Sequence, residues 1–126
     1  FFKWAKNMNI SLAVCTNKQE RLAVDLLKKL DIYKYFEYVA GSDTFAFNKP
    51  DPRHLTDVVE IIGGNLKKTI MVGDSEVDAM SAHNAGLPFV LIKDGYTEKT
   101  EKEIKHDELI SDFMGFEKII QKYIYD

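Results

Sequence analysis

The sequence predicts an α/β fold in which a doubly wound parallel sheet carries helices on both faces. Short apolar runs recur along the chain without polar alternation, which is typical of strands buried on both faces. Segments with the apolar spacing of amphipathic helices lie between these runs. Strands that alternate with helices along all 126 residues favour parallel pairing through right-handed crossovers. We expect one domain, residues 1–126, because this length provides one hydrophobic core.

The composition is that of a soluble globular protein, with 45% hydrophobic and 29% charged residues. A net charge of −3 gives no reason to expect a nucleic-acid or membrane partner. The single cysteine, Cys15, excludes an internal disulfide and suits a reducing compartment. No apolar run reaches membrane-spanning length and no signal-peptide pattern opens the chain, so we expect a cytoplasmic protein.

The first elements are expected to be a helix over residues 1–8 and a buried strand over residues 10–15 (ISLAVC). Asn17 followed by Glu20 is a capping-box pattern that would start the next helix. The apolar stripe of that helix would consist of Leu22, Leu26, Leu27 and Leu30.

A second strand is expected over residues 36–40 (FEYVA), followed by a polar and aromatic loop over residues 42–50. Asp51 and Pro52 then form an N-cap with proline at the first helical position. Gly63 and Gly64 would end that helix. Its core face would be Leu55, Val58, Val59 and Ile62.

The second half of the chain repeats the strand–helix alternation. An apolar run at residues 70–72 stops at Gly73, and the helix that follows is stopped by Gly86. The remaining expected elements are a strand at 89–92, a loop at 94–97, a short helix at 100–105, a strand at 108–111 and a helix at 116–125.

Two acidic residues follow the strand at residues 70–72. Asp74 would lie at its carboxyl end, and Asp78 one helical turn further on, so both carboxylates are expected on one side. Like charges at this spacing destabilise a bare helix by about 0.2–0.5 kcal/mol. A bound Mg²⁺ would make the placement of the two carboxylates stabilising instead. The alternative is that Asp74 only caps the helix and Asp78 lies on a solvated face.

Polar residues follow the strands expected at residues 10–15, 36–40 and 70–72. Ligands of doubly wound sheets bind at the carboxyl ends of the strands, so Thr16, Asn17, Lys49 and Asp74 are expected to converge. Thr16 and Asn17 would cradle a phosphate at a helix N-terminus, and Lys49 would offer it a point charge. The alternatives are a plain Asn17 N-cap and a solvated Lys49. Asp43, in the same loop as Lys49, is a candidate for orienting it.

Electrostatics decides what a cation would do in such a site. At a distance of about 4 Å, each carboxylate repels each phosphate charge by ~1 kcal/mol in water and by ~4 kcal/mol at an effective dielectric near 20. Asp74 and Asp78 would therefore exclude a phosphate monoester unless Mg²⁺ and Lys49 outweigh them. With both cations present, the same cluster would stabilise a transferring phosphoryl group.

Three segments carry a resemblance to a known family. Residues 13–18 (AVCTNK), 48–52 (NKPDP) and 72–78 (VGDSEVD) resemble motifs two, three and four of the haloacid dehalogenase superfamily, in matching order and spacing. Within the superfamily, residues 40–55 and 94–96 look most like the bacterial phosphoglycolate phosphatases. The resemblance implies a Rossmann-like core and a Mg²⁺-dependent phosphatase that acts through a phospho-aspartate. The expected substrate is a small phosphorylated metabolite, 2-phosphoglycolate.

The resemblance also implies roles for single residues. The phosphoryl group would be bound by Thr16, Asn17, Lys49 and Ser75. Lys49 would neutralise the phosphoryl group and the nucleophile, and Asp74 and Asp78 would hold Mg²⁺ directly or through water. Lys49, Thr16 and Asp74 are thus the expected catalytic residues.

The chain departs from the family pattern in one large respect. The family's nucleophile lies in an Asp-x-Asp-Gly-Thr motif, and no Asp-x-Asp occurs in this sequence, nor is there room for the helical cap that follows it. We expect the chain to be the carboxyl-terminal part of a longer protein, inactive alone, with open sheet edges that favour self-association. Two alternatives stay open: another phosphotransferase or phosphomonoesterase of this family (a phosphomutase or pyrophosphatase), or an inactive fragment or split subunit that keeps phosphate and metal binding.

Overall fold

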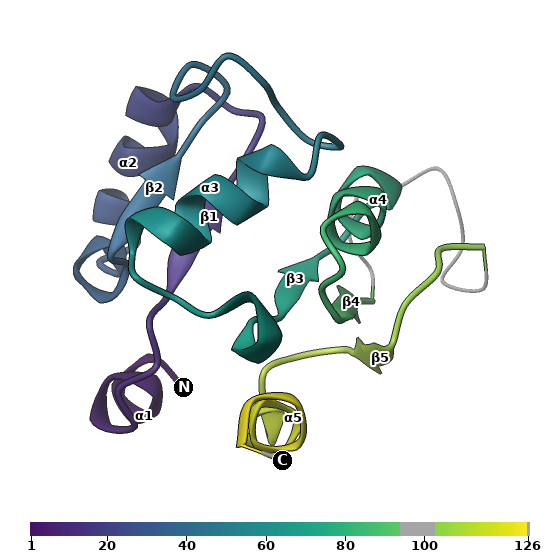
Figure 1. The fold of residues 1–126 in the computed structure, drawn as a ribbon. Helices are drawn as coiled ribbons and strands as arrows, with labels where there is room; N and C mark the ends of the chain where they lie inside the picture. The colour runs from purple at the N-terminus through teal and green to yellow at the C-terminus, as the bar shows by residue number, and fades with distance from the viewer. Residues whose placement is uncertain (94–102, 126) are drawn as a thin grey trace.

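The strands form two parallel sheets in the computed structural model, which describes residues 1–93 and 103–125, the last without its side chain. β1 (Ala13–Cys15) pairs with β2 (Tyr38–Ala40), with Ala13 opposite Tyr38. β3 (Met71–Gly73), β4 (Phe89–Ile92) and β5 (Glu108–Ile110) form the second sheet in that order (Figure 1). All pairings are parallel, so the predicted parallel α/β class is confirmed.

The helices alternate with these strands along the chain. They are α1 (Phe2–Asn7), α2 (Glu20–Lys29), α3 (Arg53–Ile61), α4 (Glu76–Asn84) and α5 (Phe116–Ile120), which continues as a π-helical turn, η3 (Gln121–Tyr125). Two 3₁₀ turns, η1 (Tyr33–Tyr35) and η2 (Leu66–Lys68), lie in the connections. Within the described residues, no helix combines the length and the apolar character needed to cross a membrane.

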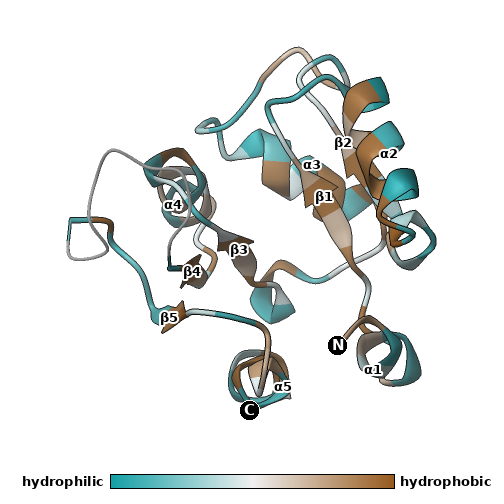
Figure 2. Cartoon of the chain, turned by 180° about the vertical axis from the view of Figure 1, so that it is seen from behind, coloured by the Kyte–Doolittle hydropathy of each residue, from teal (hydrophilic) through white to brown (hydrophobic). Residues whose placement is uncertain are grey.

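The core lies on both faces of the strands, since successive strand residues point to opposite faces. One face packs against α3 and α4 through Leu55, Ala79, Ala82, Leu87, Phe89, Leu91 and Ile104. The other face packs against α2 through Ala23, Leu27 and Val39, and against α5 through Val90, Phe116 and Ile120. Figure 2 shows β3 and β4 coloured as hydrophobic between these helices. Helices therefore cover both faces, as a doubly wound sheet requires.

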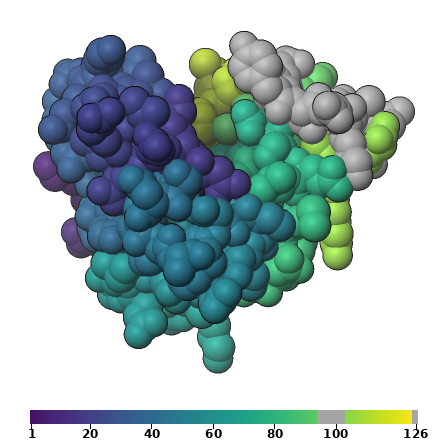
Figure 3. Space-filling view, turned by 90° about the horizontal axis from the view of Figure 1, so that it is seen from above, coloured from purple at the N-terminus to yellow at the C-terminus, as the bar shows by residue number. Residues whose placement is uncertain are grey.

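The two sheets are separate in the described part of the chain. β1 pairs with β2 and β3 pairs with β4, but β1 and β3 do not pair with each other. In the space-filling view, the purple and blue residues of the β1–β2 half and the green residues of the β3–β5 half lie on opposite sides of the molecule (Figure 3). Self-association through the unpaired edges of β1 and β3 stays a prediction.

The start of α2 differs from the expected capping box. Gln19 is the N-cap and makes no side-chain capping bond. Instead the backbone N–H of Glu20 donates to Oδ1 of Asp43 at 2.9 Å, while the Asn17 side chain donates to the carbonyl of Lys49. The capping-box prediction is wrong, and Asp43, expected to orient Lys49, caps α2 from a distant loop.

The apolar stripe expected on α2 is only partly buried. Leu27 is buried at 9% exposure, together with Ala23, because these two side chains face the β1–β2 sheet. A sheet of two short strands offers a narrow surface to a helix. The remaining leucines of the expected stripe, Leu22, Leu26 and Leu30, are therefore exposed.

The start and end of α3 follow the expectation closely. The N-cap is Pro52 rather than Asp51 and the helix begins at Arg53, but the Asp51 carboxylate still accepts the backbone N–H of Arg53 at 2.9 Å. Such shifts of one or two residues are usual at helix ends. The chain leaves α3 through Gly63 with a φ of +72°, a conformation that favours glycine. Of the expected core residues, Leu55, Val58 and Val59 are buried and Ile62 is half-buried.

The later strands agree with the expectation, whereas the expected short helix does not. β4 has the expected bounds, and β5 is one residue shorter than expected. The loop at 94–97 and residues 100–102 of the expected short helix lie outside the described residues. Residues 103–105 are not helical, so the helix prediction is wrong for them.

Candidate active site

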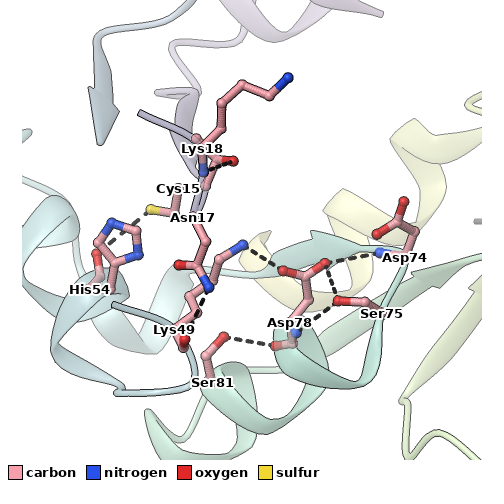
Figure 4. A network of polar contacts seen from close by, with 10 residues as sticks. Cys15, Asn17, Lys18, Lys49, His54, Asp74, Ser75, Asp78 and Ser81 are labelled. Atoms are coloured by element: carbon pink, nitrogen blue, oxygen red, sulfur yellow. Dashed lines mark hydrogen bonds and ion pairs between the residues drawn. The ribbon is translucent and has the colours of Figure 1, made fainter. Parts of the chain in front are cut away.

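The predicted site residues meet at the carboxyl ends of β1, β2 and β3. Thr16 and Asn17 follow β1, Lys49 lies in the loop after β2, and Asp74 follows β3. Figure 4 shows Asn17, Lys49 and Asp74. An ion pair joins the two halves of the molecule here, because Lys49 Nζ lies 2.6 Å from Asp78 Oδ1. Their side chains are only 9% and 11% exposed. The two alternatives without a functional role, a solvated Lys49 and a solvated Asp78, are therefore wrong.

Asp78 is held on both of its carboxylate oxygens. Oδ1 accepts Lys49, while Oδ2 accepts the backbone N–H of Asp74 at 3.2 Å and the hydroxyl of Ser75 at 3.1 Å. The N-cap of α4 is Ser75 rather than Asp74, and its Oγ accepts the backbone N–H of Asp78. Ser81 Oγ donates to the Asp78 carbonyl at 2.9 Å. These bonds fix both the backbone and the carboxylate of Asp78.

Gly73 makes room for this arrangement. A Cβ at position 73 would lie 2.5 Å from Asp78 Oδ2, closer than real Cβ contacts occur. Only glycine lets the end of β3 approach the carboxylate so closely. The glycine that ends the apolar run in the sequence is thus also the residue that admits Asp78.

Lys49 is held by its backbone as well as by its side chain. Asn17 Nδ2 donates to the Lys49 carbonyl at 3.1 Å, which attaches the lysine loop to the end of β1. The Lys49–Pro50 peptide bond is cis. Thr16 Oγ1 accepts the backbone N–H of Lys18 at 3.1 Å, so its hydroxyl shapes the turn after β1.

Asp74 differs from the expected pair of acids on one helical face. It lies before the N-cap of α4, and Figure 4 shows its carboxylate pointing away from that of Asp78. The Asp74 carboxylate makes no hydrogen bond or ion pair within the described residues. It is therefore the acid of the site that is available for an outside partner.

The carboxylates of the site match the ligands that Mg²⁺ prefers only in part. Mg²⁺ prefers oxygen ligands and is usually held by one or two carboxylates together with phosphate oxygens. The Asp74 carboxylate fits that chemistry, whereas Asp78 is engaged by Lys49. The described residues contain no group of three or more His, Cys, Asp or Glu side chains that could hold a metal ion.

Two groups beneath the site were not assigned a role from the sequence. His54 is fully buried, and its ring nitrogens have no hydrogen-bond partner in the described part of the chain. Burial lowers the pKa of His54, and the charge of Lys49 lowers it further. Cys15 Sγ donates to the His54 carbonyl at 3.7 Å, and burial raises the pKa of this thiol to about 11. A thiol with that pKa is protonated and unreactive at neutral pH.

Known proteins resemble the chain in sequence. A family model described as haloacid dehalogenase-like hydrolase matches residues 1–92. A phosphoglycolate phosphatase of Agrobacterium fabrum is 46% identical over 118 residues, which cover 90% of this chain and 51% of that protein. One from Mesorhizobium japonicum is 44% identical over 102 residues, covering 81% of this chain and 45% of that protein.

Solved structures resemble it in fold. A predicted phosphoglycolate phosphatase from Haemophilus somnus superposes with a TM-score of 0.89 at 29% identity, over 95% of this chain and 54% of that one. The chain thus spans about half the length of the relatives that it matches. The matched residues include the ends of β1, β2 and β3 that carry Thr16, Lys49 and Asp74. The chain therefore belongs to the haloacid dehalogenase-like hydrolases.

Proposed function

We propose that these residues form part of the active site of a Mg²⁺-dependent phosphatase with 2-phosphoglycolate as its substrate. The observation that carries the proposal is the buried Lys49–Asp78 pair, which fixes a cation near the strand ends that Thr16 and Asp74 follow. The relatives described above support the substrate, because they are named phosphoglycolate phosphatases.

Each residue has a distinct part in the proposed reaction. Lys49 offsets the negative charge of the substrate phosphoryl group while Asp78 holds the ammonium in place. The Thr16 hydroxyl and the Asn17 amide lie at the end of β1, where they would bind phosphoryl oxygens and, for Asn17, also hold the Lys49 backbone. Ser75 orients Asp78 through its hydroxyl and would offer a further polar group to the phosphoryl oxygens.

Asp74 is the residue proposed to hold the metal, with Asp78 as a second ligand through water. Bound Mg²⁺ would supply Lewis-acid polarisation of a phosphoryl oxygen and offset the charge of the carboxylates. Asp74 would then orient the phosphoryl group toward Lys49 rather than repel it.

The phospho-aspartate route needs a nucleophilic aspartate, and this sequence contains no Asp-x-Asp motif. We therefore propose that the route operates in the whole protein and that the 126-residue chain alone does not release phosphate. The chain alone would then be the inactive alternative considered above, keeping phosphate and metal affinity. We also propose a cytoplasmic location, a small phosphorylated metabolite as partner, and no nucleic-acid or membrane partner, in keeping with the net charge of −3.

The test is phosphate release by the whole protein from a panel of phosphomonoesters, with and without Mg²⁺. We expect 2-phosphoglycolate to give the highest kcat/KM and a chelator to abolish turnover. Lys49→Ala and Asp74→Asn should each reduce kcat/KM by a factor of about 100 or more, the usual size of a lost charge-stabilising group. Lys34→Ala, at a lysine whose side chain is 62% exposed, is the matched control. Release that continues without Mg²⁺, or that prefers a sugar phosphate, would refute the assignment.

A further inference from the structure

Lys49 lies in a loop in which a stack of side chains joins residues that precede Lys49 to residues that follow it. The loop leaves β2 at Gly41 and enters α3 at Arg53. Phe45 and Phe47 precede Lys49, and Arg53 and His54 follow it. We call these four side chains the aromatic clasp.

The contacts within the aromatic clasp join residues before Lys49 in the sequence to residues after it. The guanidinium carbon of Arg53 lies 4.4 Å from the centre of the Phe47 ring. The rings of Phe47 and Phe45 stack at 5.5 Å with an interplanar angle of 13°. The ring centres of His54 and Phe45 lie 5.8 Å apart, and the rings form a T-shaped pair with an interplanar angle of 84°. The stack therefore runs unbroken from Arg53 to the fully buried His54.

Arg53 is held in the geometry that this stack needs. Its guanidinium makes three hydrogen bonds to the Asp51 carboxylate, at 2.7, 3.1 and 3.2 Å, and Asp51 also accepts the Arg53 backbone N–H. The Arg53 side chain is 63% exposed, so an isolated ion pair here would stabilise the fold little. Its contact with Phe47 gives the arginine a second role, because it links the start of α3 to the segment before Lys49.

Hydrogen bonds on both sides of Lys49 also restrain the loop, in addition to the Lys49–Asp78 pair, and the Asn48 carbonyl accepts the backbone N–H of Asp51 at 2.8 Å. The Lys49 carbonyl accepts one exposed bond from Asn17, and Asn48 donates to the Ser42 carbonyl at 3.1 Å. A functional group must be held to within about 0.5 Å to act efficiently. The side chains that fix the path of the loop therefore decide how precisely the ammonium meets its partner.

We propose that the Arg53–Phe47 contact positions Lys49 for phosphoryl binding, with Phe45 and His54 anchoring that contact to the core. Arg53 and Phe47 are positioning residues, because they are argued to act through the path of the loop that carries Lys49. The inference rests on the proposed function, since the group that it positions is the proposed phosphoryl-binding lysine.

The experiment measures two quantities in the whole protein. The first is the inhibition constant of inorganic phosphate, which does not depend on the amount of active enzyme and so does not change when a variant merely folds less well. The second is hydrogen exchange of the amides of residues 42–51 without substrate. The variants are Arg53→Gln, Phe47→Leu, the double variant and Arg53→Lys, and the matched control is Arg21→Gln, at the other arginine of the chain.

We expect Arg53→Gln and Phe47→Leu each to raise the inhibition constant about two- to fivefold, the effect of one cation–π contact. The double variant should be no worse than either single variant, because both remove the same contact. Arg53→Lys should recover part of the loss, since an ammonium also binds an aromatic face. Loop amides should exchange faster in both single variants, and Arg21→Gln should match the parent.

Unchanged inhibition and exchange in both single variants would overturn the inference, and so would effects that add in the double variant. If the parent shows neither phosphate release nor phosphate inhibition, the proposed function is refuted and the role in phosphoryl binding with it. Exchange of the loop amides then reports separately whether the contact orders the loop.

Discussion

The two halves of the molecule are stabilised in different ways. In the β3–β5 half, Phe89 and Val90 of β4 are fully buried, with helices packed against both faces. In the β1–β2 half, Val39 and Ala40 are buried, but Leu22 and Leu26 of α2 and Leu30 just after it are exposed. β1 is half-buried along its length, as β3 is in the other half. The β3–β5 half thus carries its own core, whereas the β1–β2 half depends more on contacts with the β3–β5 half.

The candidate site lies where the halves meet. Leu55 of α3 and Cys15 of β1 pack into the same apolar cluster as Phe89, and the Lys49–Asp78 pair lies beside them. The proposed catalytic cation is thus also a link between the halves. Variants that break this link, or that probe each half by itself, show how strongly the site and the fold depend on each other.

Removal of Asp78 is expected to have the largest effect. Asp78→Ala leaves the Lys49 ammonium buried without its partner, and breaking a buried pair in this way costs about 3–5 kcal/mol of unfolding free energy. Phosphate release by the whole protein should be lost as well. Urea unfolding measures the first effect and the phosphatase assay the second.

The double variant Lys49→Met/Asp78→Leu serves as the control for this prediction. It removes both charges, so it should be more stable than Asp78→Ala while remaining inactive. A double variant as unstable as Asp78→Ala would show that packing, not the unpaired charge, causes the loss. Lys34→Ala, which breaks an exposed pair with Asp31, should cost less than about 1 kcal/mol.

Core truncations compare the halves directly. Phe89→Ala should cost about 3–5 kcal/mol, because it empties a fully buried position in the central strand. Leu27→Ala should cost about 2–5 kcal/mol, near the lower end, since α2 covers a narrow sheet. Leu26→Ala, at 46% exposure, is the neighbouring control and should cost well under 1 kcal/mol, about the range of surface substitutions. Equal losses at Leu26 and Leu27 would mean that α2 is buried by something else in solution.

Local sequence patterns predicted the strands and most helices, because apolar runs and glycine stops act over a few neighbouring residues. The parallel arrangement and the meeting of Thr16, Lys49 and Asp74 followed from the alternation of elements. The cap of α2 could not be predicted in this way, because Asp43 reaches Glu20 from a different loop. Such contacts depend on tertiary structure, and short-range spacing carries no signal for them.

The same limit applies within the site. Spacing placed Asp74 and Asp78 on one helical face, but α4 begins only after Ser75, so the two carboxylates diverge. The sequence showed a loop lysine and a helical acid without showing that they pair. The aromatic spacing in the loop, with Phe45 and Phe47 before Lys49, was a signal that could have indicated a stacked pair.

A smaller effect is expected from pH, through the buried His54 between the halves. Its pKa is lowered in the fold by burial and by Lys49, with Cys15 and Asp51 as its other titratable neighbours. Below about pH 6.5 the unfolded chain binds a proton that the folded chain excludes. Stability should therefore fall as the pH drops through this range, and it should not change on this account above it.

The measurement is the Tm as a function of pH for the parent and for His54→Leu. The parent should lose a few degrees more than the variant between about pH 7.5 and pH 5.5, because only the parent carries this histidine. Parallel curves would show that His54 becomes protonated in the fold as easily as in the unfolded chain.

The last prediction concerns a reaction rate rather than a stability, and it reports on the contact between the halves. Cys15 is the single cysteine, and its pKa of about 11 lies two units above the ordinary value of 9.0, so at pH 8 alkylation by iodoacetamide should be roughly 100-fold slower in the folded than in the unfolded chain. Because Cys15 packs into the cluster that joins the halves, any opening between them exposes the thiol. Asp78→Ala should therefore speed alkylation under native conditions, while Leu26→Ala should not. Equal rates in these two variants would mean that the apolar cluster holds the halves together without the Lys49–Asp78 pair.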